Sequence, residues 1–246
     1  MKNYKKILIH NTKGGVGKTL ITANIAAYLA NQNKKVLLID FDKQRSLTSY
    51  FTNSEKEESW KIFTDNQVPE IIQSNVHPNI WIIPGDSKLE PQIDFLVMEL
   101  YFRNFEDKNF NDFDYIFLDL SPYQTNVTTI SYKNVDSLIL LTDPSLNSVE
   151  ILSKAVLSWK NTFEKIHLKN TIKAVIINKY TLNDQPKRAW DELQKSVNKY
   201  LLKTKIPNQA NIAKSVLVGE KWMYEQNSSK EIFKDLIEEL KQKGAI

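Results

Sequence analysis

Short apolar runs rich in aliphatic residues alternate along the chain with longer amphipathic stretches. The runs are continuously apolar, which is typical of strands buried on both faces of a parallel sheet. They lie at residues 5–10, 35–40, 79–85, 113–119, 136–142 and 171–178. The amphipathic stretches predict helices at residues 18–32, 87–103, 146–164, 185–200 and 229–243. This alternation predicts an α/β fold, with a doubly wound, mostly parallel sheet flanked by helices and ligands bound at the carboxyl ends of the strands.

Over its 246 residues the chain shows no internal repeat, low-complexity tract or linker. Because α/β domains commonly reach this length undivided, we expect a single domain over residues 1–246. The chain begins directly at its first predicted strand, so we expect no N-terminal helix-turn-helix module. The stretch 52–70 is polar and irregular, which predicts a surface excursion or short helices.

The composition excludes several classes of site. There is no cysteine, which removes disulfides, zinc–thiolate sites, iron–sulfur ligation and thiol catalysis together. The N-terminus is basic, but its apolar run covers only residues 7–9, too few for a signal peptide or a membrane span. We therefore expect a cytoplasmic protein.

Charge is distributed unevenly along the chain. Residues 1–150 carry 15 basic and 19 acidic side chains, whereas residues 151–246 carry 18 basic and 10 acidic ones. Such an imbalance indicates a polyanionic partner such as nucleic acid or an acidic membrane, although a lysine-rich face in contact with solvent has the same composition.

The segment KGGVGKT, residues 13–19, follows a predicted strand and opens a predicted helix. This is the context of a phosphate-binding loop. Glycines let the backbone curl so that successive N–H groups point at phosphate oxygens, and the following helix adds its positive N-terminal end. In such a loop Lys18 reaches the β- and γ-phosphates and the Thr19 hydroxyl binds Mg²⁺. The usual pattern has a glycine where this chain has Thr12, and here a second lysine, Lys13, follows it.

The pattern Lys-Gly-Gly-x-Gly-Lys-Thr resembles the deviant Walker A motif of the ParA/MinD group of ATPases, and the short ParA/Soj partition ATPases above all. The resemblance implies that Lys13 reaches across a dimer to the phosphates held by the partner subunit, so that ATP binding and dimerisation are one event. It also implies contacts with ATP from Lys13, Gly14, Gly15, Val16, Gly17, Lys18, Thr19 and Leu20.

Three carboxylates complete the resemblance. The segment LLIDFDKQRSLTSYF, residues 37–51, resembles the family's Asp-x-Asp-x-Gln signature, in which Asp40 lies near Mg²⁺ and Asp42 orients the attacking water. The segment FDYIFLDLSP, residues 113–122, resembles a Walker B strand ending in Asp119, which would hold a Mg²⁺-bound water. Here Ser121 replaces a proline that the family usually has. The implied catalytic residues are thus Lys13, Lys18 and Asp42, and the implied metal residues are Thr19, Asp40 and Asp119.

Later segments carry weaker likenesses. In VIINKY, residues 175–180, Asn178 matches an adenine contact, and in KIPNQANIAKS, residues 205–215, Pro207 matches a residue that closes over the base. The polar face of the last predicted helix is acidic, whereas a membrane-surface helix is basic, so we expect no membrane binding. Lysines that fall where the family places DNA contacts are Lys203, Lys205, Lys214, Lys221 and Lys230.

The resemblance implies a partition ATPase. Such a protein dimerises on Mg²⁺–ATP, binds DNA nonspecifically at the nucleoid, and is reset when a ParB-like centromere-binding protein stimulates hydrolysis. Two alternatives remain open at this stage. One is an ATPase that positions a protein cargo or a membrane complex, and the other is a nucleotide-switched regulatory module with negligible hydrolysis.

Overall fold

The computed structural model describes residues 3–64, 67–87, 93–123, 125–165, 169–217 and 220–246. Its strands form one eight-stranded sheet in the order β3-β4-β2-β5-β1-β6-β7-β8. All the described pairings are parallel except β3 with β4. The strands are β1 (Lys5–His10), β2 (Val36–Phe41), β3 (Ile72–Gln73), β4 (Ile80–Ile83), β5 (Tyr115–Leu120), β6 (Ser137–Thr142), β7 (Ile172–Tyr180) and β8 (Leu201–Pro207).

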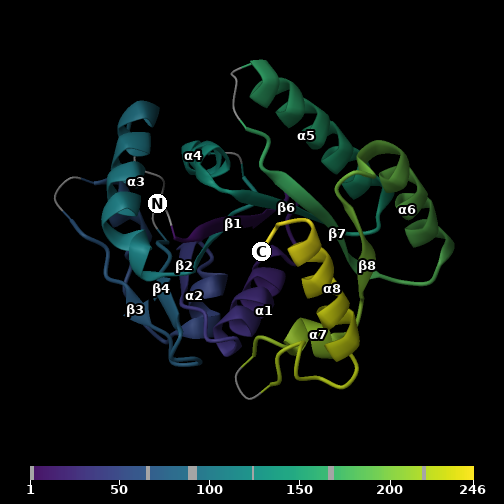
Figure 1. Ribbon diagram of the computed structural model, residues 1–246, viewed down its shortest axis with the longest axis horizontal. Coiled ribbons are helices and arrows are strands. Elements are labelled where there is room, and N and C mark those ends of the chain that lie inside the picture. Colours follow the sequence, from purple (N-terminus) through teal and green to yellow (C-terminus); the bar gives the residue numbers. More distant parts are fainter. Residues whose placement is uncertain (1–2, 65–66, 88–92, 124, 166–168, 218–219) are drawn as a thin grey trace.

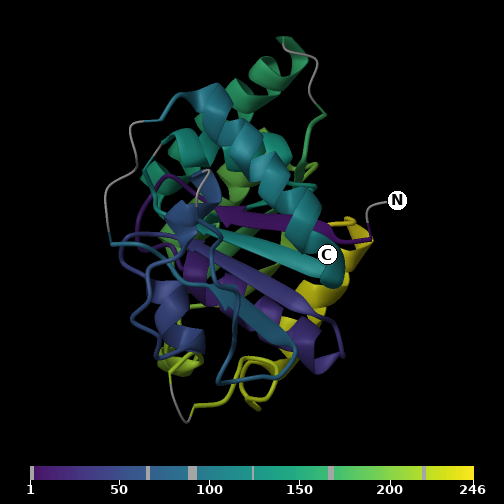
Figure 2. The same cartoon turned by 90° about the vertical axis from the view of Figure 1, so that its left-hand side faces the viewer.

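Helices cover both faces of this sheet, as Figure 1 shows. One face is covered by α1 (Lys18–Asn31), α2 (Ser46–Phe51), α7 (Ala210–Lys214) and α8 (Lys230–Gln242). The other is covered by α3 (Phe95–Asn109), α4 (Asn126–Asn134), α5 (Leu146–Lys165) and α6 (Asp184–Val197). Figure 2, seen from the side of α3, shows the strands fanned between these two layers. The predicted doubly wound α/β fold is confirmed.

The central strands are buried on both faces, which explains their continuous apolar runs. In β2, Leu38 packs into the core beneath α1 and α8, while Leu37 and Ile39 pack into the core beneath α3 and α4. All three side chains are fully buried. Because successive residues of a strand point to opposite faces, a strand between two helical layers needs apolar residues at every position.

Strand β8 was missing from the sequence expectation. Its apolar pattern is interrupted by Lys203 and Lys205, because β8 lies at the edge of the sheet and one side of it is open. A register shift against β7 turns the N–H groups of Lys203 and Thr204 toward α8. There the Glu239 carboxylate accepts both, at 2.7 and 2.8 Å. The edge strand is therefore held by a carboxylate as well as by its neighbour.

Among the helices, α3 begins later than expected, and α2, α4 and α7 were not expected. The helix expected at 87–103 is α3, which begins after Asp94, whose Oδ1 accepts the N–H of Leu96 at 2.9 Å; residues 88–92 lie outside the described part. Helix α4 was not expected, because its threonines and serine have weak helix propensity. A capping box between Thr125 and Thr128 starts it. In the stretch 52–70, a 3₁₀ helix (Ser59–Phe63) buries Phe63 completely.

Candidate nucleotide-binding site

The glycine-rich loop joins β1 to α1 at the carboxyl edge of the sheet. Gly15 and Gly17 have φ of 73° and 96°, in the left-handed region that favours glycine. At Gly17 a second constraint applies, because an added Cβ would lie 2.4 Å from Nδ2 of Asn178. That amide donates to the carbonyl of Val16 at 2.8 Å. Gly17 is therefore required both by its backbone conformation and by the close approach of β7.

Lys18 and Thr19 open α1 at the bottom of this loop. The Lys18 side chain is buried and its Nζ lies 3.5 Å from the carbonyl of Lys13. Burial lowers the pKa of Lys18, while the nearby Asp119 and Asp42 raise it. The hydroxyl of Thr19 donates to Asp119 Oδ2 at 2.8 Å. The P-loop lysine and threonine are thus held beside the carboxylate that ends β5.

Asp40 and Asp119 are direct neighbours across the parallel pair β2 and β5. Both are fully buried, and burial raises both pKa values, that of Asp40 to about 6 and that of Asp119 well above its usual range. The charge of Asp40 adds to the rise at Asp119, whereas hydrogen bonds from Thr48 and from the N–H of Asp42 oppose the rise at Asp40. Two adjacent buried carboxylates favour a nearby cation, because a positive charge stabilises their ionised forms.

The donors around these carboxylates distinguish their roles. Asp40 Oδ2 accepts the N–H and hydroxyl of Thr48 at 2.9 and 2.7 Å, and its Oδ1 accepts the N–H of Asp42 at 3.0 Å. Asp40 therefore holds the backbone of Asp42 through one oxygen and Thr48 of α2 through the other. Asp119 Oδ1, in contrast, is buried with no hydrogen-bond partner in the described residues.

This orphaned oxygen, next to the Thr19 hydroxyl, fits a Mg²⁺ ion with its water shell. Within the described residues, no group of three or more acidic, histidine or cysteine side chains is arranged to hold a metal without help. Mg²⁺ commonly takes only one or two protein ligands and completes its shell with substrate phosphates and water. Thr19 and Asp119 are the residues that would hold it, and the ion would neutralise phosphate charge during phosphoryl transfer.

The second lysine of the loop points elsewhere. Lys13 Nζ donates to Asp143 Oδ2 at 2.7 Å, to Ser148 Oγ at 2.6 Å and to Ser145 Oγ at 3.2 Å. Burial raises the pKa of Asp143, but hydrogen bonds from Lys13, Ser145 and Ser148 outweigh this and lower it to about 2. We name these three acceptors of Lys13 the lysine cradle. Lys13 is thus held by its own chain, at the start of α5.

The expected adenine contacts lie on β7 and β8. Asn178 is buried and its amide is bonded to the P-loop, so its contact with adenine stays a prediction. Pro207, at the end of β8, pairs in register with Tyr180. Lys179, which lies between Asn178 and Tyr180 in the chain, adopts a left-handed φ of 59° and donates from Nζ to the Gly15 carbonyl at 2.7 Å. Strand β7 therefore contacts the loop at two carbonyls.

A cavity of about 480 Å³ lies on the other side of the loop, next to Asp42. Its apolar wall is formed by Phe41, Trp60 and Leu120, and Ser121 and Pro122 close it toward the loop. Asp42 is half-buried, and its Oδ1 accepts the N–H of Gln44 at 3.0 Å. The predicted water-positioning carboxylate therefore faces a space that solvent can enter.

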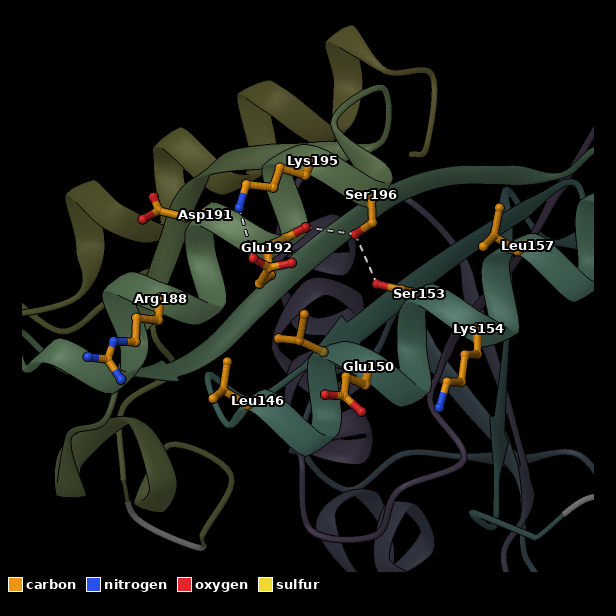
Figure 3. A pocket seen from close by; sticks show the side chains of 11 residues that line it. Leu146, Glu150, Ser153, Lys154, Leu157, Arg188, Asp191, Glu192, Lys195 and Ser196 are labelled. Atoms are coloured by element: carbon orange, nitrogen blue, oxygen red, sulfur yellow. Dashed lines mark hydrogen bonds and ion pairs between the residues drawn. The ribbon is translucent and has the colours of Figure 1, made fainter.

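A second hollow, of about 640 Å³, runs between α5 and α6 (Figure 3). The Oγ atoms of Ser153 and Ser196 lie 2.9 Å apart and link the two helices. The groove is also lined by charged residues of both signs, Glu150, Lys154, Arg188, Asp191, Glu192 and Lys195. No lining residue belongs to the P-loop or to the three expected carboxylates, so this groove is separate from the expected phosphate site.

Comparison with known proteins shows the family of this chain. A family model described as an AAA domain matches residues 4–176. The chain is also 25% identical over 254 residues to the sporulation initiation inhibitor protein Soj of Bacillus subtilis, covering 98% of this chain and 99% of Soj. This chain belongs to the ParA/Soj-like P-loop ATPases. The expected family is therefore confirmed, and with it ATP binding and nucleotide hydrolysis as general properties.

Two solved structures share the fold of this ParA/Soj-like ATPase. The ATP complex of a Cyanothece McdA variant has a TM-score of 0.82 at 19% identity, covering 100% of this chain and 98% of McdA. A proposed plasmid partition protein of Borrelia burgdorferi bound to AMPPNP has a TM-score of 0.76 at 24% identity, covering 98% of this chain and 99% of that protein. Both likenesses extend over nearly the whole chain.

The five candidate DNA lysines of this ParA/Soj-like ATPase fall into two groups. Lys203 lines a hollow with the acidic residues of α8, and Lys205 Nζ lies 3.8 Å from the ring centre of Trp190 and 4.4 Å from that of Tyr180. The other three, Lys214, Lys221 and Lys230, are exposed around α7 and the start of α8. In the described residues no helix has the length and apolarity needed to cross a membrane.

Sequence reasoning missed several residues of this site. The lysine cradle lies 130 or more residues beyond Lys13 in the chain, and Thr48 and Lys179 lie within the quoted segments 37–51 and 175–180 without a role assigned to them. A signal for the cradle was present, because TDPSLNS, residues 142–148, is a run of small polar residues directly after a buried strand. Such residues at a strand's carboxyl end are positioned to meet the P-loop.

Proposed function

We propose that this protein is a DNA partition ATPase, in which Mg²⁺–ATP drives a homodimer that binds DNA nonspecifically and is reset by a ParB-like partner. The observation that carries the proposal is the pair of lysines in one loop. Lys18 is buried beside Thr19 and Asp119, whereas Lys13 is part-exposed at the surface. One lysine then serves the nucleotide of its own subunit and the other serves that of a partner.

The chemistry proposed at the site follows from these positions. Lys18 and Mg²⁺ neutralise phosphate charge, with Thr19 and Asp119 holding the ion and Asp40 fixing the loop that carries Asp42. Asp42 orients the attacking water from the cavity beside it. Since phosphoryl transfer depends mainly on positioning and on charge neutralisation, Lys13 from the partner adds the charge that other NTPases take from an arginine finger.

The substitution Asp42→Ala tests the hydrolytic step. It removes the carboxylate that orients water but leaves the P-loop and Asp119 in place, so ATP still binds and the dimer persists on DNA. We expect phosphate release to fall by about 100-fold or more, as for loss of a catalytic positioning group. Hydrolysis at the wild-type rate in this variant would contradict the role of Asp42.

The proposed DNA surface is formed by Lys214, Lys221 and Lys230. Lysine–phosphate contacts release counterions, so binding should weaken steeply as salt rises and should not depend on sequence. Lys203 and Lys205 are less suited, because acidic and aromatic side chains already surround them. This surface would hold the protein at the nucleoid in the cytoplasm.

The DNA proposal is tested with a random-sequence duplex, in ATP, in ADP and without nucleotide, over a salt series. The triple variant Lys214→Gln, Lys221→Gln and Lys230→Gln should lose ATP-dependent binding. A control with the same charge change replaces the exposed residues Lys34, Lys56 and Lys108, and should bind as wild type does. Equal loss in both variants would show that net charge alone governs binding.

One observation favours a second candidate function, an ATPase that positions a protein cargo. The acidic side chains of α8 interrupt the basic surface near Lys203, which would weaken DNA binding there. Absence of ATP-dependent DNA binding, together with retained hydrolysis and capture of a protein partner, would select this candidate. A failure to release phosphate even with DNA and partner present would instead indicate a nucleotide-switched regulatory module.

A further inference from the structure

His10 is the last residue of β1, immediately before the glycine-rich loop, and it is fully buried. Its ring makes two contacts with other elements. Nε2 lies 3.1 Å from the carbonyl oxygen of Ser121, and Nδ1 lies 2.5 Å from the hydroxyl of Tyr132 on α4. The two rings meet edge to face, with centres 5.5 Å apart. One side chain thus joins the start of the P-loop, the loop after β5 and helix α4.

The two contacts determine which nitrogen carries the proton. Burial lowers the pKa of His10 to about 4, further lowered by Lys18 and opposed by the Ser121 carbonyl, so the ring is neutral at pH 7. A carbonyl oxygen only accepts, so the single proton must sit on Nε2 and be donated to Ser121. Nδ1 is then an acceptor, and the Tyr132 hydroxyl must donate to it. The Tyr132 hydroxyl therefore holds the ring in the orientation in which Nε2 reaches Ser121.

Ser121 belongs to the loop that forms one wall of the cavity beside Asp42. The next residue, Pro122, faces the P-loop, where a Cβ added at Gly14 would lie 3.9 Å from its Cγ. Tyr132 is itself packed on Trp159 of α5, with ring centres 4.4 Å apart. The chain of contacts therefore runs from the helical layer to the wall of the cavity beside Asp42.

We propose that His10 and Tyr132 are positioning residues for hydrolysis, which hold the Ser121–Pro122 wall beside Asp42 through the Ser121 carbonyl. This inference rests on the proposed ATPase function, and it concerns turnover and not nucleotide affinity. The P-loop amides, Lys18 and Thr19 do not depend on the wall, so loss of the contact leaves ATP binding intact. Misplacement of a wall by a fraction of an ångström is enough to slow a reaction that depends on alignment.

Two substitutions of His10 with similar polarity separate positioning from folding. The amide nitrogen of glutamine reaches the position of Nε2, whereas that of asparagine reaches only the position of Nδ1. We expect His10→Gln to retain the donor to Ser121 and to keep turnover within about threefold of wild type, and His10→Asn to lose about tenfold. Both variants should bind a fluorescent ATP analogue with dissociation constants within about threefold of wild type, since the P-loop is unchanged.

Tyr132→Phe removes only the hydroxyl and keeps the ring against Trp159. Nδ1 of His10 then loses its donor and the ring is held less firmly toward Ser121, so turnover should fall by about threefold to tenfold with unchanged nucleotide affinity. Tyr200→Phe is the control, because it also removes a tyrosine hydroxyl, one bonded to Asn170 at 3.0 Å at the opposite edge of the sheet. We expect wild-type turnover in that control.

Imidazole ¹H–¹⁵N NMR gives a readout that does not require activity. The wild-type spectrum should show His10 protonated on Nε2 alone, and Tyr132→Phe should keep this tautomer but shift the Nδ1 resonance, because the hydrogen bond to Nδ1 is lost. Equal turnover in His10→Asn and His10→Gln, or wild-type turnover in Tyr132→Phe, would overturn the inference. A wild-type protein that releases no phosphate would instead overturn the proposed function, and an Nδ1-protonated ring in the wild type would overturn the contact itself.

Discussion

The two lysines of the glycine-rich loop are five residues apart and lie in opposite environments. Lys18 is buried, with Asp119 and Asp42 as its charged neighbours. Lys13 is one-third exposed and is held by the cradle of Asp143, Ser145 and Ser148. A buried lysine can act only on the groups beside it. A part-exposed lysine with a solvent-accessible partner can break that contact and bind another group, so the comparison separates a charge that is fixed in place from one that can move.

The largest effect is expected at the buried lysine. Lys18→Gln removes the charge nearest the phosphates and should weaken ATP binding by about 100-fold or more, as measured by titration with a fluorescent ATP analogue. Lys34→Gln, which removes an exposed lysine whose Nζ lies 3.7 Å from Asp114, is the control and should bind ATP as wild type does. Normal affinity in Lys18→Gln would end the distinction between the two lysines.

Lys13→Gln should give a different result. Since Lys13 is bonded to the lysine cradle in its own subunit, monomeric ATP affinity should change by less than about threefold, while turnover should fall by at least about tenfold because the partner's phosphates lose a charge. Dimer formation with ATP, followed by light scattering, should be lost as well. A parallel loss of affinity and turnover would mean that Lys13 acts within its own subunit.

Gly14 and Gly17, which lie next to Lys13 and Lys18, can be compared in the same way by their effect on the free energy of unfolding. Gly17→Ala places a Cβ in a left-handed backbone and against Asn178, so the free energy of unfolding should fall by about 2–3 kcal/mol. Gly14 has no positive φ and its added Cβ meets only ordinary contact, so Gly14→Ala should change it by less than about 0.5 kcal/mol. Urea unfolding of the two variants measures the difference, and equal losses would contradict the assigned role of Asn178.

The smallest effect is expected for the ion pair between Lys13 and Asp143. Asp143→Asn removes the ionic partner and should lower the free energy of unfolding by about 1 kcal/mol, since the pair is partly solvent-screened. The folded-state pKa of Asp143 is depressed to about 2, so this contribution is present above the unfolded pKa of about 4 and is lost as pH falls toward 2. The difference from wild type should therefore be constant from pH 5 to 8 and shrink below pH 4. A constant difference at every pH would exclude the ion pair as its source.

The contacts of these residues explain what could be predicted. The P-loop could be predicted because its function depends on local backbone geometry, and glycines at fixed positions within seven consecutive residues specify that geometry. Strand β8 and helix α4 were missed, because the carboxylate of Glu239 and a capping box stabilise segments with weak intrinsic patterns. Asn178 was expected at adenine on the strength of the resemblance, and the structure adds its bond to Val16, 162 residues away.

The sequence alone determined the alternation of strands and helices, the phosphate loop and the carboxylates that follow buried strands, since each depends on residues close together in the chain. Only the tertiary structure decided that Asp143 holds Lys13 and that His10 holds Ser121. It also decided that the two oxygens of Asp40 accept hydrogen bonds from Asp42 and Thr48. The physical reason is the parallel sheet. Its carboxyl ends bring distant segments to one edge, and the order and register of the strands, which no local pattern encodes, decide which side chains meet there.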